Sequence, residues 1–184
     1  MIKRGEGKKA ILMLHGRGGN AEDIMSLSSN FDATTFAFTA ENNQWYPLPF
    51  MRAKELNEPY LSNSLTKIKK AIEEIKKEYE EVFVLGFSQG ACLALEIGSI
   101  LELEGIIAFS GGLIGEDKEL TSSFKTKKVF VSCSFEDPFI PLERAKVSAK
   151  KYEEQGAKVT TNFYPGQSHH ITPTDIKLAK NILK

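Results

Sequence analysis

Short apolar runs alternate along the chain with segments in which apolar residues recur at helical spacing. Continuous apolar runs bounded by turn residues are typical of buried β-strands, because such strands are covered on both faces. Six segments have this pattern and are the predicted strands: residues 10–14, 35–39, 82–85, 105–109, 128–133 and 158–163.

The segments between these runs have the period of an α-helix. Residues 60–79 show it most clearly, with Leu61, Ile68 and Ile75 spaced among lysines and glutamates. Strands that alternate with helices from end to end require parallel pairing and right-handed crossovers. We therefore predict an α/β fold in one domain, residues 1–184, with about six mostly parallel strands and helices on both faces. The other predicted helices are residues 21–27, 89–100, 141–155 and 173–183.

The charge balance bears on the possible partners. The 184 residues include 24 lysines and arginines and 24 aspartates and glutamates, so the formal net charge is zero. No excess of positive charge attracts nucleic acid or an anionic membrane. The N-terminal segment lacks the long apolar run of a signal peptide or membrane span, so we expect a cytoplasmic protein without stable membrane insertion. A neutral small molecule suits it as a partner, and a homo-oligomer stays possible.

The cysteines and histidines do not predict a metal site. Cys92 and Cys133 lie in apolar segments, where thiols act as small hydrophobic groups, and we expect no disulfide. His169 and His170 are adjacent, and neighbouring histidines rarely point the same way. No cysteine or carboxylate cluster completes a ligand set. Neither a metal nor a cofactor is expected.

Candidate chemistry begins with a serine flanked by glycines. Ser88 lies in Gly-Phe-Ser-Gln-Gly, directly after the predicted strand 82–85 and before the predicted helix 89–100. A serine at such a strand-to-helix turn has strained backbone geometry that exposes its hydroxyl. Gly86 and Gly90 are needed where a Cβ would strike the crossing strand or helix. The pattern predicts a nucleophile elbow with Ser88 at its tip.

A serine hydroxyl needs a neighbouring base that accepts its proton. Of the three histidines in the chain, His169 and His170 follow the last predicted strand. This place fits the order serine, acid, histidine that is expected along a chain with a nucleophile elbow. Position alone leaves both histidines open as the base.

The base in turn needs a carboxylate that fixes its tautomer. The predicted strand 128–133 is followed by Ser-Phe-Glu-Asp-Pro. We favour Asp137 as the acid, because a residue before proline is restricted to extended backbone and is therefore predictably aimed. Glu136 is also chemically competent, and Asp137 could instead cap the helix that begins near residue 141.

Hydrolysis at a serine also needs backbone N–H donors for the oxyanion. One donor is the residue after the nucleophile, Gln89, and the other lies in a loop after an earlier strand. Residues 15–19, His-Gly-Arg-Gly-Gly, form such a loop after the first predicted strand, and the N–H of Arg17 is the candidate. His15 is expected to be structural, with its hydrogen bonds inside this loop.

Together these motifs resemble the phospholipase/carboxylesterase family of α/β-hydrolases, which includes the acyl-protein thioesterases. The resemblance implies Ser88 as nucleophile, Asp137 as acid partner and His169 as base, with Arg17 and Gln89 as oxyanion donors. It rests on five motifs in the family's order: His15-Gly16-Arg17-Gly18-Gly19, Trp45-Tyr46-Pro47, Gly86-Phe87-Ser88-Gln89-Gly90, Asp137-Pro138-Phe139-Ile140-Pro141 and Gly166-Gln167-Ser168-His169.

The chain departs from the family pattern in two respects. Ser134 stands three positions before the acid, where the family has glycine. The chain is also short for the family, which implies a near-minimal α/β-hydrolase fold. We expect it to lack the common N-terminal hairpin and a separate cap domain.

A long irregular segment, residues 41–59, is the candidate wall of a substrate pocket. Its aromatic residues Trp45, Tyr46 and Phe50, together with Leu113 after the fourth predicted strand, could line an apolar groove or equally pack the core. No long lid is visible between the elbow and the predicted acid. The sequence thus predicts a serine hydrolase that cleaves carboxylic esters or thioesters through an acyl-enzyme, with short to medium acyl chains.

Two other functions stay open. Residues 16–21, Gly-Arg-Gly-Gly-Asn-Ala, match a dinucleotide fingerprint, and Glu41 follows the next predicted strand, as in an NAD(P)-binding oxidoreductase. That reading leaves the elbow, the acid turn and the late histidines unexplained. The second alternative is a catalytically inactive hydrolase-fold protein that serves as a binding module.

Overall fold

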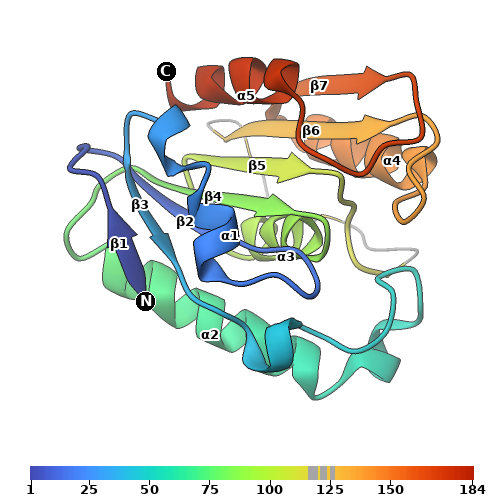
Figure 1. Cartoon of the computed structure of the whole chain (residues 1–184), viewed down its shortest axis with the longest axis horizontal. Helices are drawn as coiled ribbons and strands as arrows, with labels where there is room; N and C mark the ends of the chain where they lie inside the picture. The colour runs from blue at the N-terminus through green and yellow to red at the C-terminus, as the bar shows by residue number, and fades with distance from the viewer. Residues whose placement is uncertain (116–119, 121–123, 125–126) are drawn as a thin grey trace.

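A mostly parallel sheet forms the centre of the protein (Figure 1). The computed structural model describes residues 1–115, 120, 124 and 127–184, and these form seven strands in the order β1-β3-β2-β4-β5-β6-β7. β1 pairs antiparallel with β3, and the other neighbours pair in parallel. The strands are β1 Ile2–Arg4, β2 Ala10–Leu14, β3 Thr34–Ala37, β4 Val82–Phe87, β5 Gly105–Phe109, β6 Lys128–Ser134 and β7 Lys158–Tyr164.

Helices cover both faces of this sheet (Figure 1). α2 (Tyr60–Ile75), α3 (Gln89–Gly98) and α4 (Leu142–Glu154) pack on one face, whereas α1 (Ala21–Met25) and α5 (Pro173–Ala179) pack on the other. Among the described residues, no helix has both the length and the apolar character needed to cross a bilayer. Short 3-10 turns occupy Ser28–Asn30, Glu41–Asn43, Lys54–Asn57 and Lys180–Leu183.

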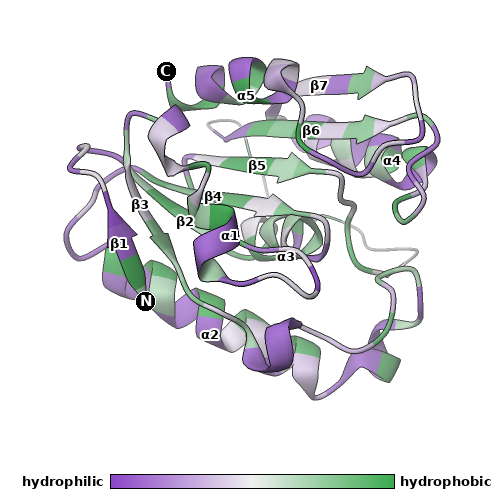
Figure 2. Ribbon diagram, viewed as in Figure 1, coloured by the Kyte–Doolittle hydropathy of each residue, from purple (hydrophilic) through white to green (hydrophobic). Residues whose placement is uncertain are grey.

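Two layers of hydrophobic core explain why the strands read as continuous apolar runs. Successive side chains of a strand point to opposite faces. In β2, Leu12 and Leu14 therefore join the core beneath α2 and α3, whereas Ile11 and Met13 join the core beneath α1 and α5. Figure 2 shows largely hydrophobic central strands and an α2 that alternates hydrophobic and hydrophilic residues. α3 is buried along its whole length, which fits its apolar sequence.

Capping boxes fix where two short helices begin. At α1, the Asn20 side chain accepts a hydrogen bond from the N–H of Asp23, and the Asp23 carboxylate accepts one from the N–H of Asn20. Thr172 and Asp175 form the same arrangement at α5. Asp175 also accepts a 2.8 Å hydrogen bond from the side chain of Asn162 in β7, so the loop before α5 is held to the sheet.

The α/β fold class predicted from the sequence is confirmed, and all six predicted strands are present. The apolar pattern does not predict β1, because this strand is three residues long and carries the exposed Lys3 and Arg4 instead of an apolar run. Helical spacing predicts a helix up to residue 79, whereas α2 ends at Ile75. The last predicted helix divides at Lys180 into α5 and a 3-10 turn.

The order of the strands creates a crevice at their carboxyl ends. β2 and β4 are neighbours, and the chain leaves β2 toward α1 on one face and β4 toward α3 on the other. The loops after these strands therefore diverge. Ligands of open α/β sheets bind at such a switch point. The loops after β6 and β7 begin at the same edge of the sheet.

Candidate active site

The turn between β4 and α3 holds Ser88 in strained backbone geometry. Its φ is 55° and its ψ is −118°, in the region that favours glycine. A Cβ on Gly86 would lie 2.1 Å from the carbonyl oxygen of Gly90, and a Cβ on Gly90 would lie 2.2 Å from that of Leu14. Only glycine allows these close approaches, so the sequence pattern around the serine follows from the crossing of α3 over the sheet.

Ser88, His169 and Asp137 form one hydrogen-bonded chain. His169 Nε2 lies 2.8 Å from Ser88 Oγ, and His169 Nδ1 lies 2.8 Å from Asp137 Oδ2. The three residues follow β4, β7 and β6, so the parallel sheet brings together positions that are far apart in the sequence. The side chain of Asp137 is fully buried, and that of His169 is 14% exposed.

The environment of Asp137 keeps its carboxylate ionised. Burial by itself raises the pKa of this carboxyl group, but hydrogen bonds from His169 and from two backbone N–H groups outweigh burial and hold the pKa below its ordinary value. The two N–H groups are those of Phe139 and Ile140, each 2.9 Å from Asp137 Oδ1. An ionised carboxylate only accepts hydrogen bonds, so Nδ1 of His169 carries a proton and Nε2 is free to accept one from Ser88.

Two aromatic rings contact His169, and a hydrogen bond between two serines holds the loop that carries it. The rings of Phe87 and Phe139 each have their centroid 4.9 Å from that of the His169 ring. Ser134 Oγ donates a 2.6 Å hydrogen bond to the carbonyl oxygen of Ser168. The serine that replaces the family's glycine thus links the loop after β6 to the loop after β7.

The alternative acid and the alternative base lie outside this chain of hydrogen bonds. The carboxylate of Glu136 accepts a 2.7 Å hydrogen bond from the side chain of Gln167. His170 is exposed, and its backbone carbonyl oxygen accepts a 3.1 Å hydrogen bond from the hydroxyl of Tyr164. Geometry therefore favours Asp137 over Glu136 and His169 over His170.

The loop after β2 lies beside the serine and is held by His15. His15 Nδ1 donates to the carbonyl oxygen of Gly16 at 2.7 Å, and Nε2 accepts from the N–H of Ala40 at 3.0 Å. Burial lowers the pKa of His15, so this neutral arrangement is stable near neutral pH. Among the described residues, the N–H groups of Arg17 and Gln89 have no hydrogen-bond acceptor, and both residues line the same cavity as Ser88.

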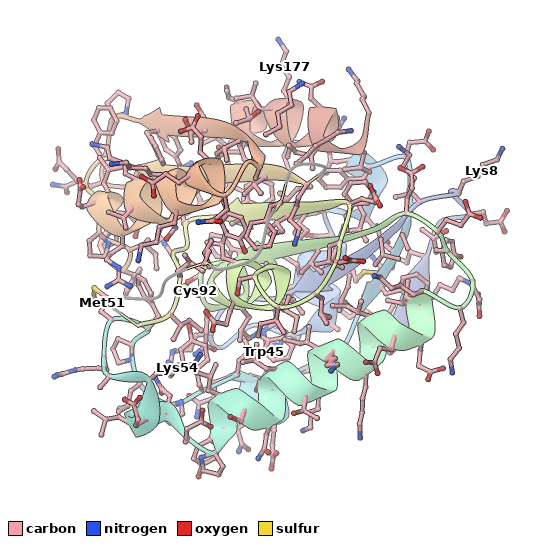
Figure 3. The ribbon with its side chains drawn as sticks, turned by 180° about the vertical axis from the view of Figure 1, so that it is seen from behind. Lys8, Trp45, Met51, Lys54, Cys92 and Lys177 are labelled. Carbon is pink, nitrogen blue, oxygen red and sulfur yellow. The ribbon has the colours of Figure 1, made fainter. Side chains whose placement is uncertain are left out.

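A cavity of about 700 Å³ opens at Ser88. Tyr46 and Phe50 line it, but Trp45 and Leu113, which the sequence also suggests as pocket residues, do not. Trp45 lies in the core, where its Nε1 donates to the carbonyl oxygen of His15 at 2.9 Å (Figure 3). Leu113 is 3% exposed and packs in the core beside α3 and α4. The lining residues are Gly16, Arg17, Tyr46, Pro47, Pro49, Phe50, Met51, Phe87, Ser88, Gln89, Cys92, Pro138, Phe139, Ile140 and His169.

The sequence patterns did not predict several of the lining residues, although the positions of these residues carried a signal. Phe87 directly precedes the elbow serine. Phe139 and Ile140 directly follow the acid and its proline. An apolar residue next to a predicted catalytic position at the end of a strand has to face either the core or the site. Phe139, which is 64% exposed, faces the site.

A strained serine at a strand-to-helix turn, on a parallel sheet covered by helices on both faces, defines an α/β-hydrolase. The comparison of the sequence with known families agrees with this class. The Phospholipase/Carboxylesterase family matches residues 2–184, and the chain belongs to that family.

Solved structures and curated proteins show the same relationship. The phospholipase/carboxylesterase of Dyadobacter fermentans is 39% identical, with a TM-score of 0.92 over 100% of this chain and 95% of that one. The Bacillus cereus carboxylesterase is 21% identical over 98% of this chain and 91% of that one, with a TM-score of 0.82, and shares the fold. Acyl-protein thioesterase 1 of Gibberella zeae is 29% identical over 57% of this chain and 48% of the relative. The chain thus matches about half the length of that curated relative.

The glycine loop is arranged differently from a dinucleotide cradle. The N–H of Gly18 donates to the carbonyl oxygen of Asn43 at 2.7 Å, and the N–H of Gly19 donates to that of Gly16 at 3.1 Å. These groups are therefore used inside the protein instead of facing a pyrophosphate. Glu41 lies in a 3-10 turn, 3.9 Å from the ammonium group of Lys67. Membership of a hydrolase family replaces the oxidoreductase hypothesis.

Both thiols are expected to be unreactive in the folded protein. Burial raises the pKa of Cys92 to about 11 and that of Cys133 to about 12. At about pH 8 roughly one Cys92 in a thousand is then a thiolate, the form that reacts. We predict that iodoacetamide at this pH leaves the native protein unmodified, although Cys92 lines the cavity, and alkylates both cysteines in denaturant. Rapid stoichiometric alkylation of native Cys92, detected by mass spectrometry, would contradict this environment.

Proposed function

We propose that the protein is a serine hydrolase that cleaves carboxylic esters or thioesters through an acyl-enzyme. In this proposal Ser88 is the nucleophile, His169 is the general base and Asp137 is its carboxylate partner. The observation that carries the proposal is the pair of 2.8 Å contacts that join Ser88 Oγ to His169 Nε2 and His169 Nδ1 to Asp137. Membership of the phospholipase/carboxylesterase family supports the reaction class.

Acylation begins when Ser88 Oγ attacks the carbonyl carbon of the substrate. The hydroxyl proton moves to His169 Nε2, and the carbonyl oxygen becomes an oxyanion that accepts hydrogen bonds from the N–H groups of Arg17 and Gln89. The tetrahedral intermediate then collapses. The alcohol or thiol leaves with the proton from His169, and the acyl group stays on Ser88.

Deacylation repeats these steps with water in place of the serine hydroxyl. His169 takes a proton from the water, which attacks the acyl carbon, and then returns the proton to Ser88 Oγ as the carboxylic acid leaves. The negative charge of Asp137 stabilises the imidazolium in both half-reactions. The positive end of the α3 dipole lies beside Ser88 and favours the oxyanion.

The cavity supports an uncharged acyl group of short to medium length. Of the described residues that line it, Arg17 and His169 are the ones with a basic side chain, and none has a carboxylate. The Arg17 guanidinium donates to four acceptors of the protein itself. The remaining wall is largely aromatic, aliphatic or proline. The relative named acyl-protein thioesterase 1 keeps thioesters among the candidate substrates.

The roles of the serine and the two histidines are tested by alanine variants. With a p-nitrophenyl ester as substrate, Ser88→Ala and His169→Ala should each lower kcat by about ten-thousandfold or more, because each removes a group that acts in both half-reactions. His170→Ala is the matched control and should keep the wild-type kcat. Labelling with a fluorophosphonate probe should depend on Ser88 and His169 in the same way. Full activity in Ser88→Ala, or loss of activity in His170→Ala, would contradict these roles.

The depth of the cavity is tested with p-nitrophenyl esters from acetate to palmitate. Each added methylene that reaches the apolar wall should raise kcat/KM by about fourfold, until the cavity is full. We expect a maximum at short to medium chains, and Phe50→Ala should move it to longer chains. Phe135→Ala, which removes an exposed ring outside the cavity, is the control and should leave the maximum in place. A rate that still rises at palmitate in the wild type would refute the proposed depth.

A further inference from the structure

Residues 43–48, here named the strap, run between the loop after β2 and the start of α3. The strap begins at the last residue of the 3-10 turn Glu41–Asn43 and contains Trp45, which is labelled in Figure 3. Ser64 of α2 donates a 2.6 Å hydrogen bond to the carbonyl oxygen of Trp45, so the strap is anchored to a long helix. Because Tyr46 and Pro47 belong to the strap, it is also one wall of the cavity.

The side chain of Arg17 binds the strap at four acceptors. Its guanidinium donates to Gln44 Oε1 at 2.8 Å and to the carbonyl oxygens of Tyr46 and Pro47 at 2.9 Å. A fourth contact reaches the carbonyl oxygen of Leu48 at 3.3 Å. The planar, forked guanidinium suits several acceptors in fixed directions in a way that an ammonium group does not.

The side chain of Gln89 binds the same segment. Its Oε1 accepts a 2.9 Å hydrogen bond from the N–H of Trp45, and its Nε2 donates a 2.8 Å hydrogen bond to the carbonyl oxygen of Tyr46. Both contacts are buried, so leaving these groups unpaired would be costly. Arg17 and Gln89, the two residues whose N–H groups are the candidate oxyanion donors, are therefore fastened by their own side chains to one segment.

Further hydrogen bonds join the glycine loop to the strap. The N–H of Gly18 donates to the carbonyl oxygen of Asn43 at 2.7 Å, and the Asn43 side chain donates to that of Gly19 at 2.8 Å. Gly18 has a φ of +78°, and a Cβ added to it would meet nothing within 4 Å. Packing against Gly18 therefore does not fix the loop at this point. The contacts to the strap hold it there, together with the hydrogen bonds of His15.

We propose that Arg17 and Gln89 are positioning residues as well as oxyanion donors: because both side chains bind the strap, they hold their own backbone N–H groups at the separation that the oxyanion requires. The inference rests on the proposed function. Oxyanion donors act only when they lie at hydrogen-bond distance from the place where the oxyanion forms, and a small displacement forfeits much of the rate. The strap thus defines the width of the oxyanion hole.

This role makes a specific kinetic prediction for Arg17→Ala, which keeps the backbone N–H and removes the four contacts. Because oxyanion stabilisation acts on the transition state, kcat should fall by about tenfold or more while KM stays within about twofold. The affinity for an alkylboronic acid, which forms a tetrahedral adduct on the serine, should fall by the same factor as kcat/KM. Arg52→Ala is the matched control, since the described residues offer no hydrogen bond to that exposed guanidinium, and it should change neither quantity.

Two more variants separate positioning from charge and from folding. Gln89→Met removes the two hydrogen bonds of the Gln89 side chain to the strap and should show the same pattern of lower kcat and weaker boronic acid binding. Arg17→Lys keeps the positive charge without the forked geometry, so it should resemble Arg17→Ala. Thermal unfolding of each variant shows the temperature range in which the variant is folded. The kcat and the affinity for the boronic acid are then measured within that range.

Three results would overturn the inference. An unchanged kcat in both Arg17→Ala and Gln89→Met would mean that the strap does not set the oxyanion hole. A higher KM at unchanged kcat would mean that it only binds substrate. Full activity in Arg17→Lys would mean that charge suffices. Failure of the proposed function itself is seen separately, because Ser88→Ala would then retain activity whatever the Arg17 variants do.

Discussion

The close crossing of α3 over the sheet is the constraint on which the rest of the site depends. Gly90 lies so near the carbonyl oxygen of Leu14, and Gly86 so near Gly90, that no larger residue fits at either position. This contact forces the chain to turn sharply at Ser88, which accounts for the positive φ of that residue. The turn places the serine hydroxyl at the carboxyl edge of the sheet, where the loops after β2, β6 and β7 also begin.

The loops around the serine are fixed by different physical means on its two sides. On one side, a buried carboxylate, Asp137, stays ionised because three donors offset its burial, and it orients His169. On the other side, hydrogen bonds from the Arg17 guanidinium and the Gln89 amide to the strap hold the glycine loop and the start of α3. An ionised carboxylate thus orients the proposed base, whereas two side chains bound to the strap position the proposed oxyanion donors. Substitutions that break the contacts on one side should lower catalysis and leave the loops on the other side folded.

The sequence predicted most of the sheet, because strands buried on both faces must be apolar throughout. It could not predict β1, whose pairing depends on the neighbouring β3, or the end of α2, beyond which the Tyr79 ring packs edge-on against Phe36 at 5.7 Å. The structure brings together Ser88, Asp137 and His169, which the motifs had singled out, since strand ends in a parallel sheet are restricted in position. The sequence left the place of Trp45 open, because an aromatic residue in a loop can face the core or the cavity and periodicity does not distinguish the two; the structure places it in the core.

The central claim is that an acyl group is transferred to Ser88 during turnover. The most direct measurement is to mix the protein with an excess of p-nitrophenyl ester, quench with acid during steady state, and locate the modification by peptide mass spectrometry. The account predicts the mass of the acyl group on the peptide that contains Ser88, and its disappearance as the ester is consumed. Steady ester hydrolysis with no adduct on that peptide, or with the adduct on another residue, would contradict the account.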